Sequence, residues 1–485
     1  MKRESYTTTI NKLQSGNSIG NTDFTVPTDY RNLEGLSSGT YGVVCKAEVP
    51  NLEAQKRLGL TANGEDEGQH TETETKMVDD SIPEVVIPDD WTNQDYQINQ
   101  VQDQNPVSAL VQSSNQSAYV AIKRLHHPFD HKTIAKRVFR EIFILKHLKS
   151  QKSEYNADNV SNFIELFTPN DYLSNISNLK DLYLICDFEG RDLTNIVLDI
   201  RNEIRMGMPL TWKLRTISFF GYQLALGLNY IHTSDIVHRD LKPSNIVIKP
   251  DPEDGFIVKI IDFGLARNMH NSVGFEIPDE DDIAENLTSY IQARAYRVPE
   301  LLLGLKNQPA NLIYDKGVDI WSFALILLEL ITGEPLFAHC YKQNGGGASK
   351  HIFEMVELLG KIPYYDDLLD LIKNSFRSFQ QEQAALTADS RLGFVLKQHL
   401  EARKFLDGSL STCFIELITN VLTYGPSRIG TNRILEHKFF NEWRTEDYLE
   451  DCAEMEEKPG VPITMPRLNH LEIDDLKKLI IETCF

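Results

Sequence analysis

Eight consecutive residues near the middle of the chain, 238–245, read His-Arg-Asp-Leu-Lys-Pro-Ser-Asn and carry the side chains best suited to chemistry. Asp240 can orient a hydroxyl group and accept its proton, and Lys242 adds a cation beside it. Asn245 and Asp262, seventeen positions apart, offer hard oxygen ligands for magnesium. These residue types predict phosphoryl transfer, which needs a positioned hydroxyl, bridging metal ions and cations around the transferred group. The alternative is a polar loop capped by Asp and Asn side chains before a glycine turn.

The composition limits the class of protein. With 485 residues and 41% hydrophobic content, the chain is long enough for roughly two to four domains. Its formal net charge of -21 disfavours nucleic acid, because a phosphate backbone is bound by clustered Lys and Arg, and favours basic protein partners. Six cysteines without CxxC spacing indicate free thiols in a reducing compartment.

Two features disfavour membrane insertion and export. The longest apolar run, 323–331, is short and contains a glutamate, whereas a membrane span needs about 20 apolar residues. It therefore predicts a buried core helix. The first residues lack the apolar stretch of a signal peptide. We expect a soluble intracellular monomer without membrane contact, located in the cytoplasm, with the nucleus left open as a second location.

Residues 48–118 differ from the rest of the chain. They contain 14 acidic and 3 basic residues, together with Pro83, Pro88 and Pro106, and show no sustained period of a helix or strand. Because so little apolar surface cannot offset the entropy of ordering it, we predict disorder. Its position between two predicted strands indicates an excursion at the edge of a sheet.

The elements that must position the chemical groups can be read from local patterns. A hairpin-like stretch surrounds Ser-Ser-Gly-Thr-Tyr-Gly at 37–42. Because glycine lacks a Cβ, the backbone amides of such a turn can approach a phosphate. Residues 119–123 alternate as a strand that ends at Lys123. Apolar residues recur at helical spacing from 133 to 148, and Glu141 lies on that stripe. A buried carboxylate needs a cationic partner, although a solvated glutamate is the alternative.

The loop at 238–245 and the Asp-Phe-Gly turn at 262–264 resemble the signature of protein kinases. The resemblance covers the chain from about Tyr30, except for the insertion. It implies an α+β bilobal protein-kinase fold, with a small lobe of antiparallel sheet plus one main helix and a large, mostly helical lobe. The implied organisation is an N-terminal tail (1–29), a kinase domain (30–440; small lobe about 30–188, large lobe about 189–440) and a C-terminal extension (441–485) returning to the small lobe.

The kinase resemblance also assigns ATP and Mg²⁺ as cofactors and gives roles to residues. Lys123 would contact the nucleotide phosphates and pair with Glu141, while Asn245 and Asp262 would hold the metal. The residues that would bind the nucleotide are Leu36, Ser37, Ser38, Gly39, Thr40, Tyr41, Gly42, Val44, Ala121, Lys123, Cys186, Asp187, Phe188, Glu189, Asp192 and Val247. Among them, Cys186 is the gatekeeper, 187–189 face the adenine edge and Asp192 reaches the ribose.

Thr288-Ser-Tyr290 resembles the dual phosphorylation site of mitogen-activated protein kinases, which are serine/threonine kinases of signalling cascades. The segment after His127, the segment 182–193 that would form the hinge between the lobes, and the C-terminal segment 471–480 resemble the same family. By this likeness phospho-Thr288 would be bound by Arg140, Arg239 and Arg267, and phospho-Tyr290 by Arg294 and Arg297. Arginine suits this role because it pairs with phosphate in a bidentate manner.

An acidic cluster near the C-terminus falls where that family binds basic linear motifs: Glu446, Asp447, Glu450 and Asp451. A solvated acidic face is the alternative. The resemblance implies protein substrates, an upstream dual-specificity kinase and phosphatases as partners.

Several positions depart from the family pattern. Serine stands at position 37 instead of glycine, and Ala293 replaces a threonine that orients the catalytic Asp and Lys. Ala295 and Val298 change the pocket for the residue after the phosphorylated Ser or Thr, where proline is expected. A pseudokinase or scaffold is therefore an alternative. A cyclin-dependent kinase fits the loop motifs but neither Thr-Ser-Tyr nor the C-terminal extension.

Overall fold

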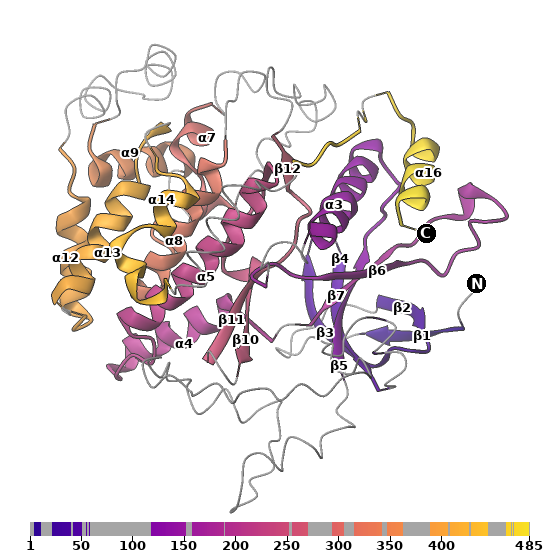
Figure 1. Ribbon diagram of the computed structural model, residues 1–485, viewed down its shortest axis with the longest axis horizontal. Coiled ribbons are helices and arrows are strands. Elements are labelled where there is room, and N and C mark those ends of the chain that lie inside the picture. The colour runs from indigo at the N-terminus through magenta and orange to yellow at the C-terminus, as the bar shows by residue number, and fades with distance from the viewer. Residues whose placement is uncertain are drawn as a thin grey trace, which may run out of the picture.

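The structure is a computed structural model. It describes residues 4–10, 22–39, 42–50, 55, 58, 118–151, 158–188, 190–251, 255–269, 293–304, 315–341, 347–361, 389–405, 408–425, 428–444, 462–466, 468 and 470–484. Figure 1 shows two lobes, a small one built around a sheet and a larger one built mainly of helices. This arrangement confirms the predicted α+β bilobal fold class.

The small lobe is a five-stranded antiparallel sheet in the order β3-β4-β5-β7-β6. These strands are Arg31–Gly39, Gly42–Val49, Ala118–Leu125, Tyr183–Asp187 and Phe163–Phe167. Along β5 the side chains alternate, so Val120 and Ile122 are buried on one face while Ala121 and Lys123 lie on the other. The second face is turned toward the large lobe, where Lys123 contacts Asp262.

The acidic insertion leaves and re-enters the sheet at one point, because Val49 at the end of β4 lies opposite Ala118 at the start of β5. Between Pro50 and Ala118 the structure describes Gln55 and Leu58, and both are buried. Gln55 donates from Nε2 to the Val49 carbonyl at 2.6 Å, and Leu58 belongs to the small-lobe core. Gln55 and Leu58 therefore pack on the small lobe, although both fall within the stretch 48–118 that was predicted to be disordered; residues 59–117 lie outside the described part of the chain.

The segment expected to be a tail contains two paired strands, β1 (Ser5–Ile10) and β2 (Thr22–Pro27). Phe24 and Val26 alternate with polar residues in β2 and are fully buried against the sheet. The Thr25 N–H donates to the Tyr183 hydroxyl at 3.1 Å, which ties the hairpin to β7. The hairpin covers the sheet face that holds Val120 and Ile122, opposite the face of Lys123.

The other side of the small lobe holds α3 (Lys132–Gln151) and α16 (Ile473–Cys484), which lie side by side in Figure 1. Lys132 Nζ is 3.1 Å from Glu472 Oε1, and Lys477 Nζ lies 5.1 Å from the centre of the Phe129 ring. Before α16, the Ile463 N–H donates to the Ser234 carbonyl of the large lobe at 3.2 Å. The C-terminal segment thus contacts both lobes.

The large lobe is organised around α5 (Leu214–Thr233) and α8 (Gly317–Thr332). Residues 318–331 of α8 are all buried, in agreement with the core helix predicted at 323–331. Among the described residues, no helix combines the length and apolarity needed to cross a membrane. The other helices are α4 (Leu193–Met206), α7 (Pro299–Gly304), α9 (Gly347–Leu359), α12 (Leu392–Ala402), α13 (Gly408–Val421) and α14 (Thr431–Leu435).

Short strands of the large lobe flank the loop at 238–245 and the Asp-Phe-Gly turn. Strands β8 (Arg191–Asp192), β10 (Ile246–Asp251) and β11 (Gly255–Ile260) form one sheet, and β9 (Ile236–Val237) pairs with β12 (Arg267–Asn268). Short 3-10 helices are η2 (Ile176–Asn178), η3 (Pro243–Asn245), η5 (Arg294–Tyr296), η7 (Ala338–Tyr341) and η9 (Lys438–Trp443). The loop at 238–245 connects β9 to β10.

Candidate active site

One buried carboxylate of α8 fixes the loop at 238–245. Asp319 is fully buried and accepts the backbone N–H groups of His238 and Arg239, each at 2.8 Å. His232 lies 3.0 Å from the same carboxylate. Burial opposes ionisation, but these hydrogen bonds lower the pKa of Asp319. Arg239 has a φ of 68°, a left-handed conformation that is uncommon for residues other than glycine. The hydrogen bonds from Asp319 therefore hold the loop in a shape that it would rarely adopt alone.

Within the loop, Asp240 is oriented by two neighbours. Lys242 Nζ donates to Asp240 Oδ2 at 2.6 Å, and Asn245 Nδ2 donates to the Asp240 carbonyl at 2.8 Å and to Oδ2 at 3.2 Å. Ala293 offers no hydroxyl to this group, so these two side chains supply the orienting contacts. The Ile261 N–H donates to the Asn245 carbonyl at 3.0 Å, which places the start of the Asp-Phe-Gly turn beside the loop.

Lys123 joins the two lobes through a pair of carboxylates. Its Nζ lies 2.7 Å from Glu141 Oε1 on α3 and 2.8 Å from Asp262 Oδ1. Burial lowers the pKa of Lys123, but the two carboxylates outweigh it and raise the pKa above its ordinary value. Burial likewise opposes ionisation of Asp262, yet Lys123 lowers its pKa to about 2. Burial raises the pKa of Glu141. At neutral pH the centre therefore contains a charged lysine and an ionised Asp262.

The roof of the predicted nucleotide pocket is formed by adjacent strands. Val44 lies opposite Lys123, and Ala121 lies opposite Cys186. Burial, reinforced by Asp187, raises the pKa of Cys186 to about 12, so its thiol is neutral and acts as a small apolar group. The predicted hinge residues Asp187 and Phe188 follow directly at the end of β7.

The floor is formed by β8 and β10, where Val247 lies opposite Asp192. Asp192 also caps α4 by accepting the Asn195 N–H at 3.2 Å. Gly190 has a φ of 96°, and a Cβ there would lie 2.6 Å from the Ile248 carbonyl oxygen. The close approach of the hinge to β10 therefore requires glycine at this position.

The predicted glycine hairpin is the turn between β3 and β4, where Gly39 lies opposite Gly42. A Cβ at Gly42 would lie 2.4 Å from the Arg124 carbonyl oxygen, so this glycine is required for the packing of β4 on β5. Leu36 is half-buried in β3, whereas Ser37 and Ser38 are exposed. Three other residues predicted for the pocket lie outside the described residues: Thr40, Tyr41 and Glu189.

Lys46 contributes to the roof and was not predicted from the sequence. It is buried, lies opposite Ala121, and places Nζ 4.3 Å from the centre of the Tyr119 ring and 4.9 Å from that of Phe188. A cation over two aromatic faces is favourable and links β4 to the hinge. Its position two residues after Val44, on the same face of the strand, was the available signal.

The arginines predicted to bind phospho-Thr288 come from three elements. Arg140 is buried on α3 beside Glu141, and Arg239 is buried in the catalytic loop. Arg267 lies in β12, opposite Val237 of β9, and thus close in space to the start of that loop. Thr288 itself is outside the described residues.

The second predicted arginine pair lies around η5, at the end of the segment 265–298 that runs from the Asp-Phe-Gly turn to α7 and is called the activation segment. Arg294 is exposed, whereas Arg297 is buried. Burial, reinforced by Arg294, lowers the pKa of Arg297. Tyr290 and the predicted docking residues lie outside the described part of the chain: Glu446, Asp447, Glu450 and Asp451.

Two contacts hold the end of this segment on the large lobe. The Tyr296 hydroxyl donates to Glu329 Oε2 on α8, and burial raises the pKa of Glu329 to about 7. Arg428 donates from Nη1 and Nη2 to the two oxygens of Glu300, at 2.8 and 3.3 Å. This bidentate pair fixes the start of α7.

Comparisons with known proteins agree with this geometry. Residues 106–440 match the protein kinase domain, a stretch that omits β3 and β4. Mitogen-activated protein kinase p38a of Drosophila melanogaster is 30% identical over 382 residues, which cover 77% of this chain and 83% of that protein. Mitogen-activated protein kinase mpkC of Aspergillus niger is 31% identical over 332 residues, covering 66% and 64%.

Mitogen-activated protein kinase 13 of Bos taurus is 37% identical over 218 residues, so this chain spans about half the length of that relative, 47%. The residues that match the protein kinase domain include the loop at 238–245 and the group formed by Lys123, Glu141 and Asp262. The extent of these matches, rather than any one motif, decides the assignment. The chain belongs to the protein kinase family and is a divergent member of its mitogen-activated protein kinase branch.

Proposed function

We propose that this protein is an active serine/threonine kinase that transfers the γ-phosphate of ATP to protein substrates and is switched on by phosphorylation of Thr288 and Tyr290. The observation that carries the proposal is the position of Lys123 between Glu141 and Asp262. In protein kinases, the lysine–glutamate pair and the metal-binding aspartate must both be in place for transfer. A chain that had lost catalysis would be under no need to keep all three groups within contact.

The described residues fit Mg²⁺ and ATP. Asp262 is ionised and Asn245 presents an amide, the oxygen donors that magnesium accepts, and Lys123 provides a cation for phosphate oxygens. A bound magnesium ion would neutralise part of the negative charge of the ATP phosphates. Asp240, oriented by Lys242 and Asn245, would then accept the proton of the substrate hydroxyl.

The pseudokinase alternative is favoured by one observation, the alanine at position 293. Without a hydroxyl there, Lys242 and Asn245 orient Asp240, and both contacts are short enough to do so. We therefore expect a lower turnover than in a kinase that has threonine at this position, not an absence of transfer. Substituting threonine for Ala293 should raise the rate.

For regulation, phosphorylation would add close to two negative charges at each of Thr288 and Tyr290. Arg140, Arg239 and Arg267 come from both lobes, so a phosphate bound by all three would stabilise the closed arrangement. Arg294 and Arg297 would bind the phosphotyrosine. The acidic residues 446–451 would bind basic motifs of substrates, of an upstream dual-specificity kinase and of phosphatases, with proline preferred after the target residue.

A transfer assay tests the proposal. Full-length protein is incubated with labelled ATP, magnesium and a general protein substrate, before and after stoichiometric phosphorylation of Thr288 and Tyr290. We expect label on serine and threonine and a rate that rises by at least tenfold on phosphorylation. Asp240→Asn, which keeps the size of the side chain, is the matched control and should be silent in both states. Wild type and Asp240→Asn with equal label incorporation would establish the scaffold alternative.

A further inference from the structure

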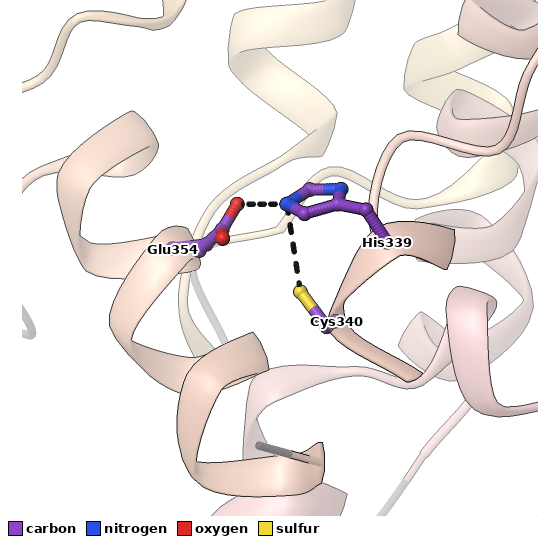
Figure 2. A group of neighbouring side chains, drawn as sticks. All are labelled: His339, Cys340 and Glu354. Carbon is purple, nitrogen blue, oxygen red and sulfur yellow. Dashed lines mark hydrogen bonds and ion pairs between the residues drawn. The ribbon is translucent and has the colours of Figure 1, made fainter. Parts of the chain in front are cut away.

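Three side chains with metal-binding atoms converge on the large lobe, away from the cleft. His339 and Cys340 are neighbours in η7, and Glu354 projects from α9. Figure 2 shows one ring nitrogen of His339 facing both the Glu354 carboxylate and the Cys340 sulfur. His339 Nε2 lies 2.5 Å from Glu354 Oε2 and 3.8 Å from Cys340 Sγ. The three ligand atoms all lie within 4.8 Å of one another.

These separations are close to those of a tetrahedral site. With Zn–N and Zn–O of about 2.0–2.2 Å and Zn–S of about 2.3 Å, two ligand atoms lie roughly 3.4–3.6 Å apart. The His339–Cys340 separation already meets this requirement within a few tenths of an ångström. The Glu354 carboxylate has to move outward by about 1 Å, because a metal would replace the proton that it shares with His339. This change needs only a rotation of a partly exposed side chain.

The residues around the three side chains also favour the binding of a cation. Lys350 Nζ lies 3.6 Å from Glu354 Oε1, the carboxylate oxygen not directed at His339, and so helps to orient this ligand. His351 is buried, and burial lowers its pKa to about 3, so it adds no positive charge. A bound cation would favour the thiolate form of the buried Cys340.

Access also fits a metal site. The Cys340 side chain is buried at the base of the cluster, whereas the His339 side chain is 44% exposed. One side of the cluster is therefore open to solvent, which leaves an entry path and room for water as a fourth ligand. Adjacent contacts already bring the two elements together, since the Tyr341 hydroxyl lies 2.8 Å from His351 Nδ1.

We propose that His339, Cys340 and Glu354 form a binding site for one divalent transition-metal ion of the zinc type. The mixed nitrogen, sulfur and oxygen donors exclude magnesium as the preferred ion and distinguish this site from the Asn245–Asp262 pair. The metal joins η7 to α9, and η7 in turn packs against η5 at the end of the activation segment. The site therefore stabilises the surface that supports Arg294–Tyr296.

The test uses Co²⁺, whose spectrum reports its ligands. Full-length protein freed of metal with a chelator is titrated with Co²⁺ and then with Zn²⁺. One equivalent of Co²⁺ should produce the visible bands of a tetrahedral ion together with a thiolate-to-cobalt charge-transfer band in the near ultraviolet, and Zn²⁺ should abolish both. Zn²⁺ should also raise the melting temperature. Without a charge-transfer band in the wild type, the proposal fails.

Variants separate this site from adventitious binding. Cys340→Ser should lose the charge-transfer band. Glu354→Gln, at a partly exposed position, should melt cooperatively in the same assay and should bind the metal about 10–100-fold more weakly. Cys413→Ser, on α13, is the matched control and should bind as the wild type does. If Cys340→Ser and Glu354→Gln bind Co²⁺ as tightly as Cys413→Ser, the cluster is only a hydrogen-bonded contact between η7 and α9.

Discussion

The hydroxyl of Tyr296 donates a hydrogen bond to Glu329 Oε2 at 2.5 Å, in the core beneath the end of the activation segment. Glu329 is 4% exposed and lies in the last turn of the apolar helix α8. Arg201 is the cation that acts on this carboxyl group, and it offsets burial only in part. Tyr296, at the end of the activation segment, is thus attached to the large lobe through a carboxyl group whose pKa burial raises to about 7.

The first prediction is a loss of stability as the pH rises. Burial raises the pKa of Glu329 from 4.5 to about 7, so the folded protein binds a proton that the unfolded chain releases. The contribution is complete below pH 4.5 and is lost as the pH rises through about 7, with a size on the order of 1–3 kcal/mol. Glu329→Gln should flatten this part of the profile in urea unfolding measured from pH 5 to 8. Glu334→Gln, at an exposed glutamate, should not.

The second prediction concerns the metal-binding aspartate. Asp262→Asn should abolish phosphoryl transfer, because the carboxylate is the main protein charge for magnesium and an amide binds that ion poorly. It should also release Lys123 from one of its two carboxylate contacts. Turnover is measured at saturating magnesium and ATP. Wild-type turnover in this variant would show that the metal is held elsewhere.

The third prediction separates the two parts of the insertion. Replacing residues 60–116 with a short Gly/Ser turn should preserve a cooperative thermal transition, because loop closure varies by only about 0.6 kcal/mol per doubling of length. Extending the deletion to residues 51–58 removes the buried Leu58 and should lower stability by about 2 kcal/mol more. Equal stabilities of the two deletions would mean that Leu58 does not contribute to the core.

The fourth prediction tests the phosphate-binding arginines. Arg140→Ala should remove most of the activation that phosphorylation of Thr288 produces, because Arg140 is the partner from the small lobe. Each charge-assisted contact is worth roughly 1.5–3 kcal/mol, enough for a tenfold shift between open and closed lobes. The measurement is the ratio of turnover with and without the phosphate. Lys132→Ala, on the same helix but bound to Glu472, is the control, and identical ratios in both variants would exclude the role of Arg140.

The contiguous motifs were the part of the site that the sequence could predict. Asp240, Lys242 and Asn245 stand within one short loop, so their types and spacing were sufficient to propose their chemistry. The likeness to kinases added the Lys123–Glu141 pair, and the structure places their side chains in contact. The α+β fold class followed from the same likeness. In each case either the local sequence or the family pattern contained the information.

What could not be predicted depends on contacts between distant segments. The N-terminal hairpin is short, and its place is set by Thr25 and Tyr183, which are 158 positions apart. Lys46 lies over the ring of Phe188, and His339 contacts Glu354. Neither pair is connected by a helix or strand periodicity in the sequence. The burial of Leu58 was missed because the composition of the whole insertion is polar while one apolar residue near its start reaches the core.

The course of the C-terminal segment constrains how the lobes can move. The chain crosses between the lobes at the hinge, and it crosses again where Ile463 binds the large lobe and α16 binds α3. Two rigid lobes that are connected at two points rotate most easily about the line that joins those points. Relative motion of the lobes should therefore be mainly a rotation about this axis, so inter-lobe distances far from both attachments should change together while those near either attachment stay constant.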